Sequence, residues 1–168
     1  MTNTFLLRLT GAGLLLLAGA VAHADPCKVA IESNDLMRFS LHEITVPAEC
    51  IDVEVTLKHS GVMPAKVMGH DWVLAKDSDM SAIVNAGLAA GAARGYLAAN
   101  DKRVIAATRL VGAGDSATVR FSTSALQPGQ RYSFFCTSPG HSAAMRGRFL
   151  FGDSARLARA GKPQSQPQ

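Results

Sequence analysis

Residues 132–145 read Tyr132-Ser133-Phe134-Phe135-Cys136-Thr137-Ser138-Pro139-Gly140-His141-Ser142-Ala143-Ala144-Met145. The aromatic residues before the cysteine favour a strand, and the Pro-Gly pair predicts a tight turn after it. Cys136, His141 and Met145 then supply a thiolate, an imidazole and a thioether from one short loop. Soft sulfur ligands combined with imidazole favour copper over hard cations. We therefore expect a metal-binding loop here, provided that a second histidine reaches it.

Most of the remaining chain has the pattern of short strands. Residues 51–58 and 117–122 alternate apolar and polar side chains with the period of two that is typical of a half-buried strand. Gly- and Pro-containing turns precede residues 117 and 132. Further strand candidates are Lys28–Ile31, Leu36–Leu41, Ile44–Val46, Trp72–Leu74, Arg103–Leu110 and Arg148–Phe151. Many short strands with such turns predict an all-β fold, an antiparallel sandwich or barrel.

One segment has helical periodicity instead. Apolar side chains recur at helical spacing in residues 80–88, which predicts a helix from about Ser78 to Ala90. Asp77, Ser78 or Asp79 could cap its N-terminus. Met80 lies on the apolar stripe of this helix, so we interpret it as a packing residue rather than a ligand.

The ends of the chain differ in composition from its centre. Arg8, the apolar run Gly11–Val21 and Ala22-His23-Ala24 are typical of a secretory signal peptide at residues 1–24. The apolar run is shorter than the roughly 20 residues that span a bilayer, and no other stretch approaches that length, so no membrane span is expected. Residues 25–152 form the predicted domain, and the polar, Pro-rich residues 153–168 a predicted disordered tail.

Charge and cysteine content narrow the possible classes of protein. Residues 25–168 carry 16 Lys and Arg against 13 Asp and Glu, without a basic stripe, which argues against nucleic-acid binding. Exported proteins reside in oxidising compartments, where disulfides persist. A Cys27–Cys50 bridge would leave Cys136 unpaired. Two free buried thiols are the alternative at Cys27 and Cys50. An odd cysteine in an exported protein indicates either reactivity or metal binding.

A second imidazole for the loop must come from a distant histidine. After residue 24 the chain contains His42, His59, His70 and His141, and His70 lies between a turn and a predicted strand. We interpret His42 as an exposed residue without a role in the site. A histidine at a strand end can reach the Cys136 loop when two sheets pack face to face. Two imidazoles and a thiolate, with Met145 as a weak axial neighbour, are typical of an electron-transfer copper centre.

These motifs resemble azurins, which are bacterial cupredoxins. The resemblance runs from Cys27 to about Phe151, and is strongest at Met68-Gly69-His70, Phe134-Phe135-Cys136-Thr137, Pro139-Gly140-His141 and Met145. It implies a Greek-key sandwich of about eight strands with a helical insertion. It also implies one type-1 copper ion bound by His70, Cys136 and His141, with Met145 and the carbonyl oxygen of Gly69 as long axial contacts. His59 is similar to an azurin histidine that does not bind copper, and we treat it as structural.

Two positions depart from the usual azurin pattern. Asp71 stands where azurins commonly have Asn, and an ionised carboxylate can accept but not donate hydrogen bonds. Its charge would favour Cu(II) and lower the reduction potential unless the carboxyl group retains a proton. Ser138 stands where azurins usually have Phe, and places a hydroxyl near the thiolate. We expect a blue site with a shifted potential, because groups around the sulfur tune it.

The resemblance implies a periplasmic, monomeric electron carrier rather than an enzyme. Met63, Pro64 and Met68 would form an apolar rim for transient contact with cytochromes and copper-containing reductases, although core packing is the alternative for these methionines. A periplasmic copper carrier or buffer would use the same ligands, but would need to release the metal. A Cys-His hydrolase would require an orienting residue and an oxyanion site that no motif here predicts. A structural zinc site is chemically possible, but Met is a poor zinc ligand.

Overall fold

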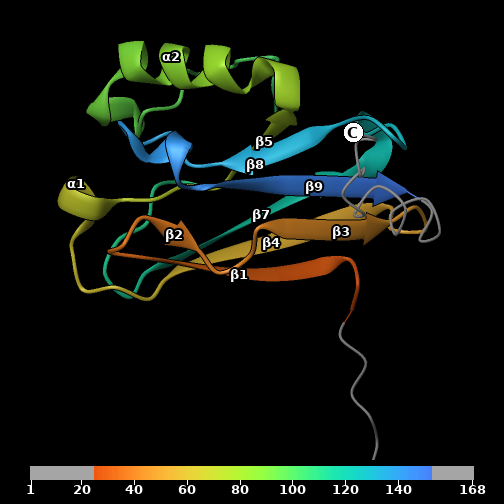
Figure 1. The fold of residues 1–168 in the computed structure, drawn as a ribbon, viewed down its shortest axis with the longest axis horizontal. Helices are drawn as coiled ribbons and strands as arrows, with labels where there is room; N and C mark the ends of the chain where they lie inside the picture. Colours follow the sequence, from red (N-terminus) through yellow and green to blue (C-terminus); the bar gives the residue numbers. More distant parts are fainter. Residues whose placement is uncertain (1–24, 153–168) are drawn as a thin grey trace, which may run out of the picture.

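The computed structural model describes residues 25–152, so the predicted signal peptide and the predicted C-terminal tail lie outside the described residues. Two β-sheets pack face to face, as Figure 1 shows. The first sheet has the order β2-β1-β4-β7, and consists of β1 (Lys28–Asn34), β2 (Arg38–Phe39), β4 (Asp52–His59) and β7 (Ser116–Ser122). The second has the order β3-β9-β8-β5-β6, and consists of β3 (Glu43–Pro47), β5 (Val73–Lys76), β6 (Val104–Ala107), β8 (Tyr132–Phe135) and β9 (Arg146–Gly152).

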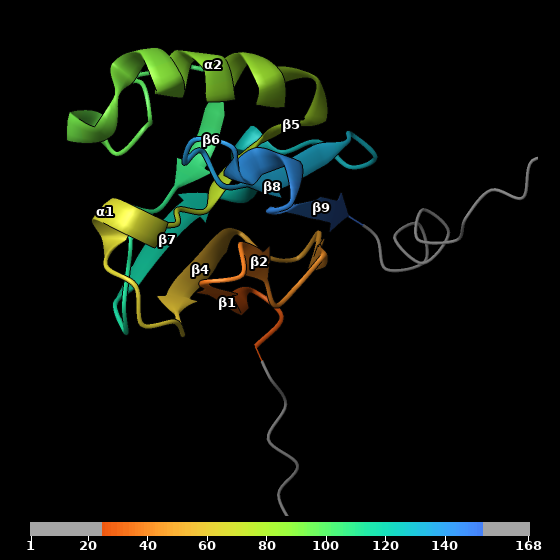
Figure 2. The same cartoon turned by 60° about the vertical axis from the view of Figure 1, so that its left-hand side comes forward.

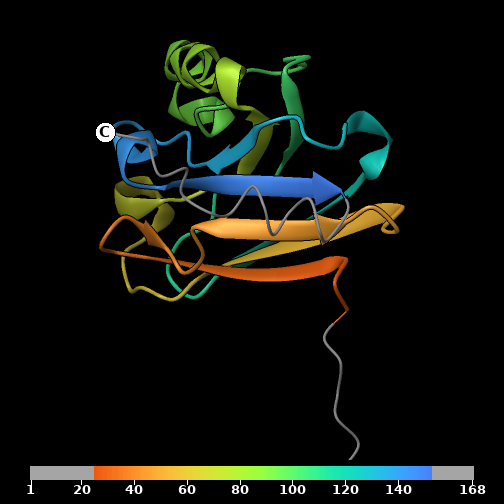
Figure 3. The ribbon, with the colours of Figure 1, turned by 45° about the vertical axis from the view of Figure 1, so that its right-hand side comes forward.

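The sandwich confirms the predicted fold class, with differences in detail. The described residues contain nine strands rather than about eight, because the two-residue β2 pairs with the end of β1. The sheets are mixed rather than purely antiparallel: β1 pairs with β4, and β3 with β9, in parallel. Figure 3 shows β3 beside β9, with β1 in the layer below. Both parallel pairs arise because the chain crosses from one sheet to the other between the paired strands.

Two predicted strands were too long. Residues 36–41 form only β2, because Met37 adopts a left-handed backbone with φ of 54°, which ends extended structure. Residues 103–110 form only β6, which ends at Ala107. There the backbone N–H of Trp72 donates to the hydroxyl of Thr108 rather than to a carbonyl, so the regular ladder stops.

The helical prediction is confirmed with a shifted start. The 3-10 turn η1 (Asp77–Asp79) leads into α2 (Met80–Ala90), and Asp79 holds the N-cap position without a side-chain capping bond. Gly91, with φ of 75°, ends the helix, and the 3-10 turn η2 (Ala92–Arg94) begins the return. A Cβ on Gly87 would lie 2.0 Å from the carbonyl oxygen of Tyr96, so the return segment packs directly on the helix. Figure 1 shows α2 on the outer side of the second sheet.

Three shorter helical segments occur in the other connections of the described chain. They are α1 (Ala65–Met68), η3 (Thr123–Ala125) and η4 (His141–Ala143). The sequence patterns did not predict α1, because a single four-residue turn is too short to display a period.

Period-two alternation orients the strands that lead into the candidate site. Every residue of β8 is buried, because the first sheet covers one of its faces and α2 the other. Phe134 packs in the main core, whereas Phe135 packs with Ile83 in a second cluster. Cys136 follows with the same orientation as Phe134 and also lies in the main core.

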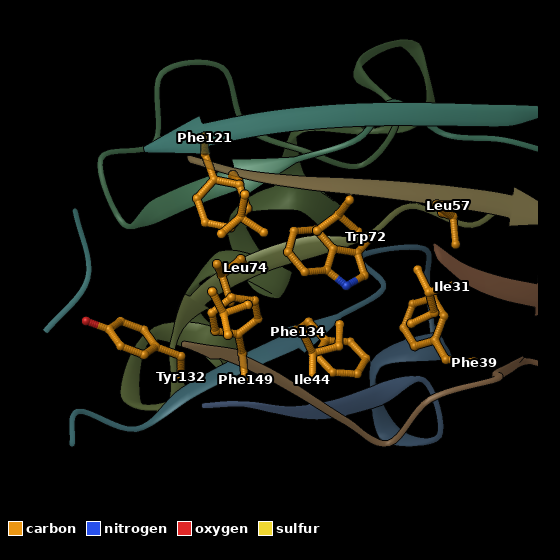
Figure 4. Packing of buried hydrophobic residues seen from close by; sticks show 14 of the residues in the cluster. Ile31, Phe39, Ile44, Leu57, Trp72, Leu74, Phe121, Tyr132, Phe134 and Phe149 are labelled. Atoms are coloured by element: carbon orange, nitrogen blue, oxygen red, sulfur yellow. The ribbon is translucent and has the colours of Figure 1, made fainter. Parts of the chain in front are cut away.

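Aromatic side chains fill the centre of the sandwich. Figure 4 shows Trp72 between Phe121 and Phe134, with ring centroids 6.3 and 6.1 Å from its own, and Phe149 lies 6.4 Å away. Trp72 is fully buried. A rigid aromatic core of this kind holds the strand ends in place, because close-packed interiors transmit small displacements rather than absorb them.

The predicted disulfide is present. Cys27 and Cys50 are bonded, with Cα atoms 5.6 Å apart, which leaves Cys136 as the free cysteine of the described chain. The bridge joins the start of β1 to the segment before β4. A cross-link that closes a loop of this length stabilises the fold by about 3 kcal/mol.

Candidate metal centre

His70 is held on both its backbone and its ring. Its backbone N–H donates to the carbonyl of Val111 at 2.9 Å, and its carbonyl accepts from the N–H of Val111 at 2.8 Å. The ring Nε2 lies 2.9 Å from the carbonyl oxygen of Asn34 and must donate to it, because a carbonyl can only accept. A neutral imidazole that carries its proton on Nε2 has a lone pair on Nδ1. The Nδ1 atom is therefore prepared to bind a metal.

His59 supports the same ring from the other side. It is the fourth inward-facing residue of β4, and its ring stacks on that of His70 with centroids 4.9 Å apart and planes 9° apart. Its Nε2 lies 3.0 Å from the carbonyl of Met68, and its Nδ1 accepts from the N–H of Gly61 at 3.0 Å. From the sequence we interpreted His59 as structural, but the sequence did not show that its ring stacks on that of His70. The alternation of β4 continues through residue 59 and is the signal that indicates an inward-facing ring.

Cys136 and His141 lie at the two ends of a short loop. The backbone N–H of Cys136 donates to the carbonyl of Met145 at 3.0 Å, which closes the loop at its base. Gly140 adopts a left-handed backbone with φ of 79°, a conformation that glycine adopts at little cost. The N–H of His141 then donates to the carbonyl of Ser138 at 3.0 Å. Figure 2 shows this turn, between β8 and β9, at the same end of the sandwich as α1 and β2.

The predicted ligand atoms converge. The Nδ1 atoms of His70 and His141 are 3.2 Å apart, and Sγ of Cys136 lies 3.9 and 3.7 Å from them. A circle through these three atoms has a radius of about 2.1 Å. That radius matches the roughly 2.0–2.3 Å bonds that imidazole nitrogen and thiolate sulfur make to a first-row ion such as Zn²⁺. Within residues 25–152 these three side chains form the metal-compatible cluster, and all three are buried.

Burial sets the charge of the three groups when no ion is bound. It lowers the pKa of His70 to about 4, although the bond to Asn34 opposes this shift. It also lowers the pKa of His141. Burial, and then the nearby carboxylate of Asp71, raise the pKa of the Cys136 thiol. The imidazoles are therefore neutral and available at neutral pH, and a bound metal ion displaces the thiol proton.

The two predicted axial groups lie on the segments that carry the ligands. Met145 is fully buried in the main core, on the segment that closes the Cys136 loop. The carbonyl oxygen of Gly69, on the residue before His70, accepts a hydrogen bond from the hydroxyl of Ser138 at 2.7 Å. Both residues are therefore on ligand-bearing segments, and their axial roles remain predictions.

Asp71 joins the two ligand-bearing loops. Its Oδ1 accepts from the backbone N–H of Thr137 at 2.7 Å, and its Oδ2 from the hydroxyl of Thr137. Burial raises the pKa of Asp71, whereas both bonds from Thr137 oppose that rise. A carboxylate that accepts from two donors can replace an amide as a link between the loops. Sequence reasoning identified Asp71 but not its partner Thr137, because nothing in the local pattern indicates which residue lies opposite.

The residues predicted to form an apolar rim are exposed or half-buried. Met63 is 40% exposed, Pro64 is exposed and Met68 is half-buried. Further exposed apolar side chains lie on the segments that adjoin His70, namely Leu36, Met37, Val62 and Val67. The loop at residues 35–37 is tied to the loop at 61–63, because Asp35 accepts from the N–H groups of Val62 and Met63. His42 is exposed, as expected.

Together, the β-sandwich and its buried His-Cys-His set define a cupredoxin-type protein with one type-1 copper site. Comparisons with known proteins agree. Residues 25–151 match the model of a family described as copper binding proteins, plastocyanin/azurin family. The chain is 45% identical over 140 residues to an azurin from Pseudomonas aeruginosa, covering 83% of this chain and 95% of that protein. It is 43% identical over 142 residues to an azurin from Achromobacter denitrificans, covering 84% and 95%.

A solved structure has the same fold. An azurin from the obligate methylotroph Methylomonas sp. strain J superposes with a TM-score of 0.72 at 41% identity, covering 74% of this chain and 97% of that one. The chain therefore belongs to the plastocyanin/azurin family of copper-binding proteins. Its cofactor is copper, and the chemistry of the donor set agrees with that assignment.

Proposed function

We propose that this protein carries single electrons between redox proteins in the periplasm, with a copper ion bound by His70, Cys136 and His141. The observation that supports this most strongly is the triangle of ligand atoms, whose radius already matches metal–ligand bonds. A copper ion bound there supplies a Cu(I)/Cu(II) couple. The bonds to Asn34, Val111 and Met145 hold the ligands in one arrangement, so little rearrangement would accompany gain or loss of an electron.

Met145 and the Gly69 carbonyl would be the two weaker ligands of the proposed copper site. In sites of this type the axial ligand and the groups around the cysteine sulfur tune the reduction potential. Asp71 and Ser138 are the residues of this chain that bring a carboxylate and a hydroxyl into that region.

Export to the periplasm is supported by two features. Residues 1–24 have the pattern of a signal peptide. The Cys27–Cys50 disulfide is typical of proteins that reside in oxidising compartments. Among residues 25–152, no helix combines the length and apolar character needed to cross a bilayer.

The partners we propose are periplasmic cytochromes and copper-containing reductases, bound transiently by a monomer. Beside the predicted rim residues Pro64 and Met68, the exposed apolar side chains on segments next to His70 are those of Leu36, Met37, Val62, Met63 and Val67. His141 is 8% exposed, and the small residues Gly140, Ala143 and Ala144 beside it leave its outer edge approachable. A small apolar contact of this kind suits brief redox encounters, which bury less than about 1,200 Å².

A copper carrier or buffer is the second candidate, and the geometry favours it less. All three ligands are buried, and hydrogen bonds fix the backbone of each of them. A protein that hands over its metal needs ligands that a recipient can reach. A nucleophilic enzyme is also disfavoured, because burial and Asp71 raise the pKa of Cys136 and a reactive cysteine needs the opposite shift.

An optical spectrum of the copper-loaded protein tests the proposal. We expect an intense blue thiolate-to-copper band in the oxidised form that disappears on reduction and returns on reoxidation. Cys136→Ser is the matched control, because it keeps the size of the side chain but removes the thiolate, and should abolish the band. A colourless oxidised wild-type protein, or rapid loss of copper to a competing chelator, would favour the carrier instead.

A further inference from the structure

The hydroxyl of Ser138 contacts the backbone of the other ligand-bearing loop. Ser138 is 4% exposed, and its Oγ donates to the carbonyl oxygen of Gly69 at 2.7 Å. The direction is fixed, because a carbonyl oxygen only accepts. Ser138 follows Cys136 by two residues and Gly69 precedes His70 by one. The bond therefore joins the Cys136–His141 loop to the segment that bears His70, directly beside the metal centre.

The Gly69 carbonyl has little freedom to turn away from this contact. A Cβ on Gly69 would lie 2.4 Å from the carbonyl of Ala65 and 2.7 Å from the side chain of Leu110, so the backbone is wedged between α1 and the segment after β6. The next residue, His70, is paired with Val111 through both its N–H and its carbonyl. Within residues 25–152 it is the Ser138 hydroxyl that donates to the Gly69 oxygen.

We propose that Ser138 is a positioning residue that limits the Gly69 carbonyl oxygen to a weak contact with the metal, and so favours copper over zinc in this site. This inference rests on the proposed copper site. A hydroxyl proton beside the carbonyl oxygen places positive charge where a cation would otherwise approach. Zn²⁺ in proteins is almost always four-coordinate, and three donors leave it one ligand short. A type-1 copper centre needs only a trigonal set with a weak axial neighbour.

The residue is a feature of this chain rather than of the family pattern. Azurins usually have Phe at this position, and a phenyl ring has no proton to donate to the carbonyl. The sequence did not indicate which group the Ser138 hydroxyl bonds. In the structure it bonds a backbone carbonyl of the opposite loop.

The test compares the affinities of the metal-free protein for Cu²⁺ and Zn²⁺ in chelator competition, before and after Ser138→Ala. We expect the variant to bind Zn²⁺ more tightly relative to Cu²⁺ by roughly two- to tenfold, the factor that one neutral hydrogen bond represents. Ser142→Ala is the matched control, because it removes a hydroxyl from the same loop and should leave the ratio unchanged.

A role in packing alone predicts a different result, because a small cavity at residue 138 would weaken both metals together. An unchanged Zn²⁺/Cu²⁺ ratio, or equal losses for both ions, would overturn the proposal. Failure of the proposed electron-transfer function is separately visible, because it appears as a colourless wild-type Cu²⁺ protein. The zinc measurement does not depend on colour. Failure of the Ser138 proposal and failure of the proposed electron-transfer function can therefore be distinguished in the same set of samples.

Discussion

At one end of the sandwich, the disulfide between Cys27 and Cys50 ties the start of β1 to the segment before β4, and a hydroxyl, that of Thr123, donates to the carbonyl of Cys50 at 2.7 Å. At the opposite end, the ligand-bearing loops are joined by hydrogen bonds from Thr137 to Asp71 and from Ser138 to Gly69. Figure 1 shows the two ends separated by the length of the strands.

The comparison indicates that the two ends of the sandwich have different roles. The disulfide end contributes stability through a covalent link, and its polar groups are backbone carbonyls that a threonine satisfies. The metal end has buried histidines, a buried carboxylate and a buried thiol, which are costly to remove from water unless each has a partner. Hydrogen bonds to those groups make the site possible. The predictions below test whether the two ends are independent.

Removal of the disulfide should have the largest effect on stability. Replacing Cys27→Ala and Cys50→Ala together should lower the free energy of unfolding by about 3 kcal/mol, because the unfolded chain regains the freedom that the cross-link removed. Urea denaturation measures this change. The blue band of the copper-loaded variant should match that of the wild type, and an altered band would show that the two ends are coupled.

The two buried threonines form a matched pair, one at each end. Thr137→Val leaves an oxygen of the buried Asp71 without its donor, and should cost about 1–3 kcal/mol of stability. Thr123→Val removes bonds to the carbonyls of Cys50 and Ile51, although the N–H of residue 123 still donates to Ile51, and should cost about 1 kcal/mol.

The spectrum and the reduction potential separate these two variants. Both should change in Thr137→Val, because Thr137 adjoins Cys136 and contacts the residue after His70. Neither should change in Thr123→Val. A shift of potential in the Thr123 variant would contradict the independence of the two ends.

The last prediction concerns the reduction potential of Asp71→Asn. The amide removes a buried negative charge beside the ligands and so disfavours Cu(II), which should raise the reduction potential by on the order of 60 mV, equivalent to a tenfold change for one electron. Voltammetry of the two proteins at the same pH measures it. Identical potentials would reject an ionised Asp71 and indicate that its carboxyl group retains a proton.

Local sequence patterns determined the fold class, the helix and the ligand loop. The alternation at residues 51–58 predicted β4 apart from its ends, since the strand runs from Asp52 to His59 and Ile51 is exposed. The spacing of apolar residues predicted α2. The loop from Cys136 to Met145 could be recognised because its ligands are close in sequence and a glycine permits the turn. Patterns of this kind depend on local periodicity and backbone preference, which are properties of the chain itself.

The resemblance to azurins implied that His70 joins Cys136 and His141, and the tertiary structure shows the three side chains together. Only the tertiary structure paired Thr137 with Asp71 and directed the Ser138 hydroxyl to Gly69. These contacts join residues more than sixty positions apart, and depend on how two sheets pack and where each strand ends. The mixed sheets and the stacking of His59 on His70 arise in the same way. The sequence therefore determined which chemical groups are available, and the packing of the sandwich decided which of them meet.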